Sequence, residues 1–165
     1  MKSVEVLIPD NEGNHLVVVL YFYDDEDKIH TFQIPDDFSN IDIADINISK
    51  LNVDKSLYIS AFFKLSSWLI EQFLLFPNAV FSFICSTDPL ENHISTRSPE
   101  LDRWTLFEFL YKRKKTELEY LGINSKDIIV GPDGYQTFAR VFYRDKHSQI
   151  IHLVIAHLTN KYNNI

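Results

Sequence analysis

The spacing of apolar residues changes along this chain, and that change constrains the class of fold it can adopt. Val4, Val6 and Ile8 alternate with other residues, which is the period of a strand with one buried face. Residues 58–76 and 101–121 instead repeat apolar side chains at helical spacing. A chain that carries both periods is predicted to be an α+β protein, in which helices pack on a sheet.

Further strands are predicted from runs rich in β-branched and aromatic residues. In chain order they cover residues 16–23, 29–34 and 79–85, and a closing hairpin of 135–144 and 149–158. The acidic run 24–27 is predicted to be a hairpin turn, and residues 35–54 are predicted to be largely irregular. We expect a single domain over residues 1–165. Its one mostly antiparallel sheet would comprise an N-terminal meander, a central strand and the C-terminal hairpin, covered by two long amphipathic helices.

The composition excludes several large classes of protein. Glycine is scarce, with 4 residues in 165, and neither a P-loop nor a dinucleotide-binding fingerprint is present. A net charge of −7 at pH 7 argues against a broad nucleic-acid-binding surface and suits a basic partner. No apolar run is long enough to span a membrane, and the single cysteine, Cys85, lies in an apolar strand as an inert thiol. We therefore predict a cytoplasmic protein that has no cofactor and does not enter a membrane.

The densest cluster of reactive side chains lies between the strand 79–85 and the second helix. It combines hydroxyls, an acid, an imidazole and two guanidinium groups: Ser86, Thr87, Asp88, His93, Thr96, Arg97 and Arg103. His93 is the candidate for acid–base catalysis in this cluster. However, no nucleophile-elbow glycines flank Ser86. A turn at Asp88-Pro89 and a helix cap at Ser98 account for much of the segment without any catalysis.

The arginines favour anion binding over catalysis. Arg97 precedes the predicted cap and Arg103 lies in the first turns of the helix, where free backbone N–H groups can bind phosphate or carboxylate. Arg140, on a later strand, joins them if the sheet brings the two regions together. The predicted binding residues are Thr87, Asp88, Arg97, Arg103 and Arg140. No metal site is predicted, because the histidines form no metal-binding pair at helical spacing. His152 and His157 also fall on opposite faces of the predicted last strand.

Three features occur together in this chain: an N-terminal β-meander, a long helix before Pro77, and the strand end Cys85-Ser86-Thr87-Asp88 leading to an arginine-bearing helix with Trp104, Phe107 and Phe109. In these features, which span most of the chain, the sequence resembles a family of small, uncharacterised Bacteroidota-type proteins with a domain of unknown function. The resemblance implies arginines before the aromatic helix, and Arg97 and Arg103 match those places. Residues 89–95 depart from the tighter spacing of that family, so the resemblance assigns no place to His93. It supplies no activity.

Two functions of different classes are considered. The leading hypothesis is a protein-binding accessory module, antitoxin-like in character, based on the acidic net charge, the missing catalytic signature and an aromatic content of 14%. It requires that Phe22, Tyr23, Tyr135 and Tyr143 are not all fully buried. The alternative is a small nuclease or toxin-like phosphodiesterase that uses residues 86–103, with residues 112–115 steering RNA.

A third hypothesis, an acyl-CoA acetyltransferase, is suggested by the mixed order of strands and helices. It fails because the sequence lacks a Gly-rich loop that would bind the pyrophosphate before the helix. Whether the protein is an enzyme is left open by the sequence.

Overall fold

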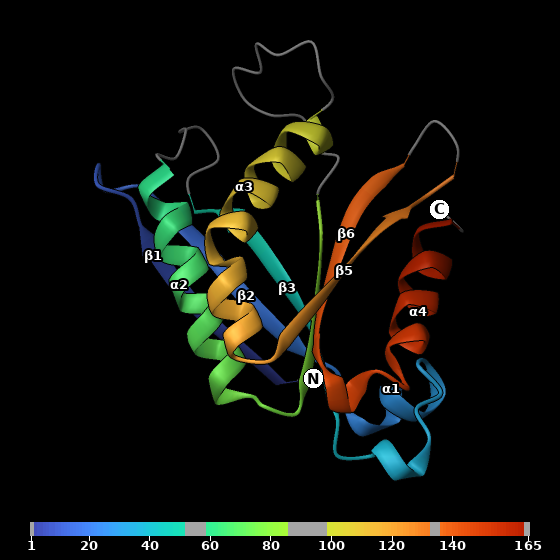
Figure 1. Cartoon of the computed structure of the whole chain (residues 1–165). Coiled ribbons are helices and arrows are strands. Elements are labelled where there is room, and N and C mark those ends of the chain that lie inside the picture. Colours follow the sequence, from blue (N-terminus) through green and yellow to red (C-terminus); the bar gives the residue numbers. More distant parts are fainter. Residues whose placement is uncertain (1, 52–58, 86–98, 133–135, 164–165) are drawn as a thin grey trace.

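The computed structural model describes residues 2–51, 59–85, 99–132 and 136–163, and its centre is one six-stranded sheet (Figure 1). From one edge to the other, the strands are β1 (Lys2–Pro9), β2 (His15–Phe22), β3 (Asp42–Lys50), β4 (Ala79–Ile84), β6 (Thr137–Arg144) and β5 (Ile123–Val130). β3 and β4 run parallel, and every other neighbouring pair is antiparallel. The predicted α+β class with a mostly antiparallel sheet is therefore confirmed.

Helices α2 (Ile59–Leu75) and α3 (Pro99–Tyr120) cover one face of this sheet, as predicted (Figure 1). Aromatic rings fill the contact, with Phe73 of α2 against Phe81 and Phe107 of α3 against Phe83. Gly122 follows the end of α3 with a φ of +73°, a left-handed conformation that favours glycine and ends the helix where the sequence predicted.

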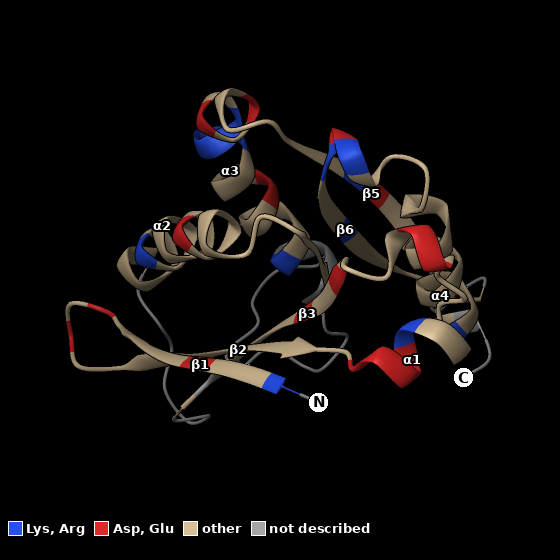
Figure 2. Ribbon diagram, turned by 90° about the horizontal axis from the view of Figure 1, so that it is seen from below, with Lys and Arg blue, Asp and Glu red and all other residues tan. Residues whose placement is uncertain are grey.

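A second layer, which the sequence did not predict, lies on the opposite face. It consists of α1 (Asp25–His30) and α4 (Ile151–Asn163), together with the short 3-10 turns η1 (Asp36–Phe38) and η2 (Asp145–His147). Its apolar core joins Val154 and Leu158 of α4 to Val80 and Val141 of the sheet. This layer packs on β4, β6 and β5 and on Ile43 at the start of β3. No described helix lies over the corresponding face of β1 and β2 (Figure 2).

The predicted strand over residues 29–34 is wrong, because the acidic run before it starts a helix. The Asp24 side chain accepts a hydrogen bond from the Asp27 backbone N–H, which caps α1. The carboxylates of the first turn also lie at the positive end of the helix dipole. The residues interpreted as a hairpin turn are thus a helix N-terminus, and the third strand of the meander is β3, within the segment predicted to be irregular.

The predicted strand over residues 149–158 is also wrong. The C-terminal hairpin pairs β6 with β5, whereas 149–158 largely belongs to α4. Buried side chains in this region follow helical spacing: Ile150, Ile151, Val154 and Leu158. His152 and His157 consequently lie on a helix, where the argument from strand parity does not apply. None of the described helices is long and apolar enough to cross a membrane.

Candidate functional site

The predicted cluster is only partly within the described residues. Thr87, Asp88, His93 and Arg97 lie outside them. Arg103 lies near the start of α3, and Arg140 lies on β6. The charges of both arginines act on the thiol of Cys85, the residue after β4. The convergence of Arg140 with Thr87, Asp88 and Arg97 stays a prediction, because those three residues lie outside the described part of the chain.

Cys85 is buried at the end of β4 and held by hydrogen bonds. Its backbone N–H donates to the Phe138 carbonyl, and its carbonyl accepts from the Thr137 hydroxyl. Burial raises the pKa of the Cys85 thiol to about 12, despite the opposing charges of Arg103 and Arg140. The thiol is therefore protonated at neutral pH, as expected for an inert cysteine.

Arg140 is the most unusual buried residue of the described fold, because a full guanidinium charge is only 1% exposed. On the neighbouring strand, Asp127 accepts from Nε at 2.5 Å and from Nη2 at 3.0 Å. Glu108 of α3 accepts from the same Nη2. Burial opposes the charge, but the hydrogen bonds and charges of Asp127 and Glu108 outweigh it, so the pKa of Arg140 is raised. The Arg140 guanidinium therefore stays protonated, and the neighbouring carboxylates of Asp127 and Glu108 balance its charge.

Two aromatic rings hold the guanidinium plane in place. The Arg140 Cζ atom lies 3.9 Å from the ring centre of Tyr111 and 4.8 Å from that of Trp104, which places the cation within reach of both π faces. Trp104, Glu108 and Tyr111 recur along α3 at i, i+4 and i+7, so one side of the helix supplies all three contacts. The sequence analysis missed Glu108 and Asp127. Glu108 could have been recognised from the sequence, because it is an acidic residue on the apolar side of a predicted helix.

One nitrogen of this guanidinium has no hydrogen-bond partner among the described residues. Nη1 of Arg140 is buried and forms no hydrogen bond with the described residues. Buried donors are almost always satisfied in folded proteins, and an unsatisfied one costs about 1–3 kcal/mol. Within the described residues, this nitrogen is therefore a buried donor without a hydrogen-bond acceptor.

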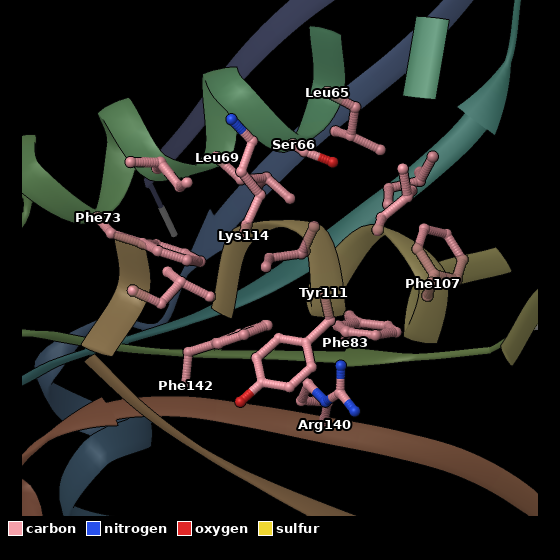
Figure 3. Close-up of a pocket in the computed structure, with 15 residues that line it drawn as sticks. Leu65, Ser66, Leu69, Phe73, Phe83, Phe107, Tyr111, Lys114, Arg140 and Phe142 are labelled. Atoms are coloured by element: carbon pink, nitrogen blue, oxygen red, sulfur yellow. The ribbon is translucent and has the colours of Figure 1, made fainter. Parts of the chain in front are cut away.

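A small cavity lies beside Arg140, between the sheet and helices α2 and α3 (Figure 3). Its volume is about 60 Å³, and its walls are mainly apolar side chains from β3, α2, β4, α3 and β6. Ser66, Lys114 and Arg140 are the polar side chains among those that line it. Pairing of β3 with β4 stops at Asp45 and Ser82, and inward-facing residues beyond that point line the cavity: Ile46, Ile48 and Phe83. The cavity thus sits where the parallel pair ends.

A broader groove lies in the second layer, between α4 and the segment after α1. Its lining includes Gln33, His157 and Lys161, and Gln33 has a φ of +56°, which is uncommon for a residue other than glycine. Burial, followed by the charge of Lys161, lowers the pKa of His157. No group of three or more His, Cys, Asp or Glu side chains that could hold a metal occurs in the described ranges.

The face of β1 and β2 opposite α2 carries an exposed apolar stripe, with Ser3 and Glu5 of β1 beside it. Leu7 is 49% exposed and Tyr21 is 39% exposed, and the half-buried Val17 and Val19 lie between them. We call these four residues the open face; Leu7 pairs with Val17 in the register of the two strands. In Figure 2, acidic residues mark the ribbon on β1, at the β1–β2 turn and on α1.

The four aromatic residues that the sequence analysis named for a partner surface differ in burial. Phe22 is buried against Phe76 and Phe81 and serves the core. Tyr23 and Tyr143 are half-buried, and Tyr135 lies outside the described residues. The Tyr23 hydroxyl donates to Asp45, which also accepts from Ser82. Tyr21, which was not named, is the aromatic residue that the fold leaves exposed on the open face.

The comparisons with known proteins give no family for this chain. No family model matches it. No curated protein matches it either. The resemblance drawn from the sequence therefore stays a prediction.

Proposed function

We propose that this protein is a protein-binding accessory module, antitoxin-like in character, that docks a partner on the open face. The observation that carries the proposal is the contiguous apolar surface of Leu7, Val17, Val19 and Tyr21, over which no described element packs. Sheet faces normally bury such side chains against a second layer. Helices α1 and α4 supply that layer over β4, β6, β5 and the start of β3, and none of the four residues of the open face belongs to their apolar cluster.

The surrounding charge favours a basic partner. Glu5 lies on the same side of β1 as Leu7, and the net charge of the chain is −7 at pH 7. Acidic residues at the rim of an apolar patch steer association toward positively charged proteins and oppose self-association. We therefore expect the partner to present an apolar patch bordered by lysine or arginine.

The test compares the wild-type chain with Leu7→Glu and Ile129→Glu in quantitative affinity capture from lysate of the source organism. Ile129 is a matched control, because it is an aliphatic strand residue that is 59% exposed on β5, at the far edge of the sheet. We expect wild type and Ile129→Glu to enrich the same basic protein, and Leu7→Glu to lose it. Light scattering after size-exclusion chromatography tests for a second copy on the open face.

Two results would contradict the proposal. One is equal enrichment by all three chains once circular dichroism has shown that each is folded. The other is a homodimer that Leu7→Glu dissociates, since the open face would then bind a second copy of this chain. The nuclease alternative receives no support from the described residues, because His93 and Arg97 lie outside them, and we do not propose it here.

A further inference from the structure

We propose that the outer side of α3 binds an acidic segment of a partner protein, in which carboxylates surround an apolar side chain. The surface consists of five residues, which we call the α3 stripe: Phe109, Lys112, Arg113, Thr116 and Tyr120. It belongs to the layer of α2 and α3, whereas the open face lies on the other side of the sheet. The inference therefore stands or falls independently of the proposed function.

The α3 stripe is one continuous surface that the fold leaves exposed. Its members recur at i, i+3, i+4, i+7 and i+11, so they lie on one side of the helix, opposite the buried Leu118. All five residues are exposed, with Phe109 at 45% and Tyr120 at 90%. A helix that only covered the sheet would carry polar residues on this side. Exposed aromatic rings beside an arginine are instead typical of the residues that dominate binding at protein interfaces.

The Arg113 guanidinium packs against two aromatic rings. Its Cζ atom lies 4.5 Å from the ring centre of Phe63 on α2 and 5.8 Å from that of Phe109, and the two ring centres are 6.3 Å apart. Helices α2 and α3 lie side by side (Figure 1). Both distances allow cation–π attraction. Because the rings hold the guanidinium, it loses little conformational freedom when its N–H groups bind a carboxylate.

The positive charges of α3 are unevenly balanced. Lys114 and Lys115 each pair with a glutamate one turn further along the helix. Lys112 and Arg113 form no ion pair with a described residue, and the α3 stripe contains no acidic residue. The stripe is thus a local positive site on a chain whose net charge is −7. Two unpaired cations beside exposed aromatic rings complement a segment that presents carboxylates and an apolar side chain.

The same charges favour a peptide over a nucleic acid. A single-stranded nucleic acid carries a phosphate at every nucleotide and binds along a groove of many cations. On the α3 stripe the unpaired cations are Lys112 and Arg113, and by helical spacing Glu117 and Glu119 flank the stripe on its two sides. These glutamates are 51% and 64% exposed, so they would repel the phosphates that continue past the two cations.

The experiment measures the fluorescence anisotropy of three labelled probes with the purified protein. The probes are a short acidic peptide with glutamates around a phenylalanine and a leucine, the same peptide with glutamine in place of every glutamate, and single-stranded oligouridylate. We expect the acidic peptide to bind saturably with a dissociation constant in the micromolar range. It should bind at least about tenfold more tightly than either of the other probes.

Lys112→Glu and its matched control Lys126→Glu locate the binding. Lys126 is an exposed residue of β5, so the two variants make the same change of charge. Ser125 of β5 contacts Tyr111 of α3, so Lys126 points to the opposite face of the sheet. We expect Lys112→Glu to weaken binding of the acidic peptide by about tenfold or more, and Lys126→Glu to weaken it by less than about threefold. Phe109→Ala should weaken it by about fivefold, because the apolar contact is lost.

Three results would overturn the inference. The first is an acidic peptide that does not bind saturably, which would leave the α3 stripe as a solvated helix face. The second is binding of the glutamine peptide or of oligouridylate as tightly as the acidic peptide, and the latter would favour a nucleic-acid surface. The third is equal weakening by Lys112→Glu and Lys126→Glu, which would indicate a non-specific effect of charge. Should a variant fail to fold by circular dichroism, the comparison of the three probes on the wild-type protein still decides the matter.

Discussion

Removal of the Asp127 carboxylate tests whether the buried arginine depends on its partners. In Asp127→Ala, Arg140 loses two charge-assisted hydrogen bonds and keeps only Glu108. Breaking a fully buried ion pair costs about 3–5 kcal/mol, whereas an exposed pair contributes about 0–1 kcal/mol. The Asp127 side chain is 51% exposed, so water replaces part of what is lost. We therefore expect a loss of about 2–4 kcal/mol in the free energy of unfolding, because Arg140 itself remains almost inaccessible.

Glu117→Ala is the matched control for this prediction. The Glu117 side chain is also 51% exposed and pairs with a cation, but that cation, Lys114, is itself 30% exposed. We expect its removal to cost at most about 1 kcal/mol. Urea unfolding followed by circular dichroism measures the free energy of unfolding of both variants. In thermal unfolding, the midpoint temperature of Asp127→Ala should fall by roughly 4–16 °C. The reasoning is refuted if the two variants lose stability equally, since burial of the cation would then be irrelevant.

Two further predictions concern His147 and the alternative function. Burial, followed by the charges of Lys146 and Arg144, lowers the pKa of His147 to about 4. Between about pH 6.5 and pH 4, the His147 side chain is therefore protonated in the unfolded chain and neutral in the folded chain. The free energy of unfolding should fall by up to about 3 kcal/mol as the pH falls through this window. Urea unfolding at pH 7 and pH 4.5 should show a smaller loss for His147→Asn than for the wild type. An equal loss in the two chains would rule out His147 as the cause. Incubation of the purified protein with total RNA, beside a His93→Ala/Arg97→Ala double variant, tests the nuclease alternative. We expect no cleavage by either, and cleavage by the wild type alone would favour the enzyme over a binding module.

Elements with one dominant local signal were predictable from the sequence. Helix α3 begins at Pro99 and is followed by Gly122, and its apolar period is helical, so propensity and pattern agree. The errors occur where two signals compete. The acidic run at 24–27 suits both a turn and a helix N-terminus, and the β-branched run at 149–158 suits both a strand and a helix buried on one side. The local cap by Asp24 decided the first case, and burial of one helix face decided the second.

The candidate site was predictable only in part, because its chemistry depends on register. Arg140 was named as a binding residue, and the structure places it opposite Asp127 and against α3. No local pattern reveals that pairing, since β5 is a polar edge strand whose alignment with β6 is set by the hairpin. The roles of Thr87, Asp88, His93 and Arg97 stay predictions, because these residues lie outside the described part of the chain.

The parallel pairing of β3 with β4 joins the two three-stranded halves of the sheet. Strands before α2 form one half of the sheet and strands after it form the other. The strand pairing that joins them runs only from Asp42 with Ala79 to Asp45 with Ser82, and ends at the hydrogen bond between the Ser82 hydroxyl and Asp45. Side chains of β3 on one side of this junction and of β4 and β6 on the other line the cavity. The open face belongs wholly to the first half, and the apolar core beneath α2 and α3 joins that half to the strands after α2.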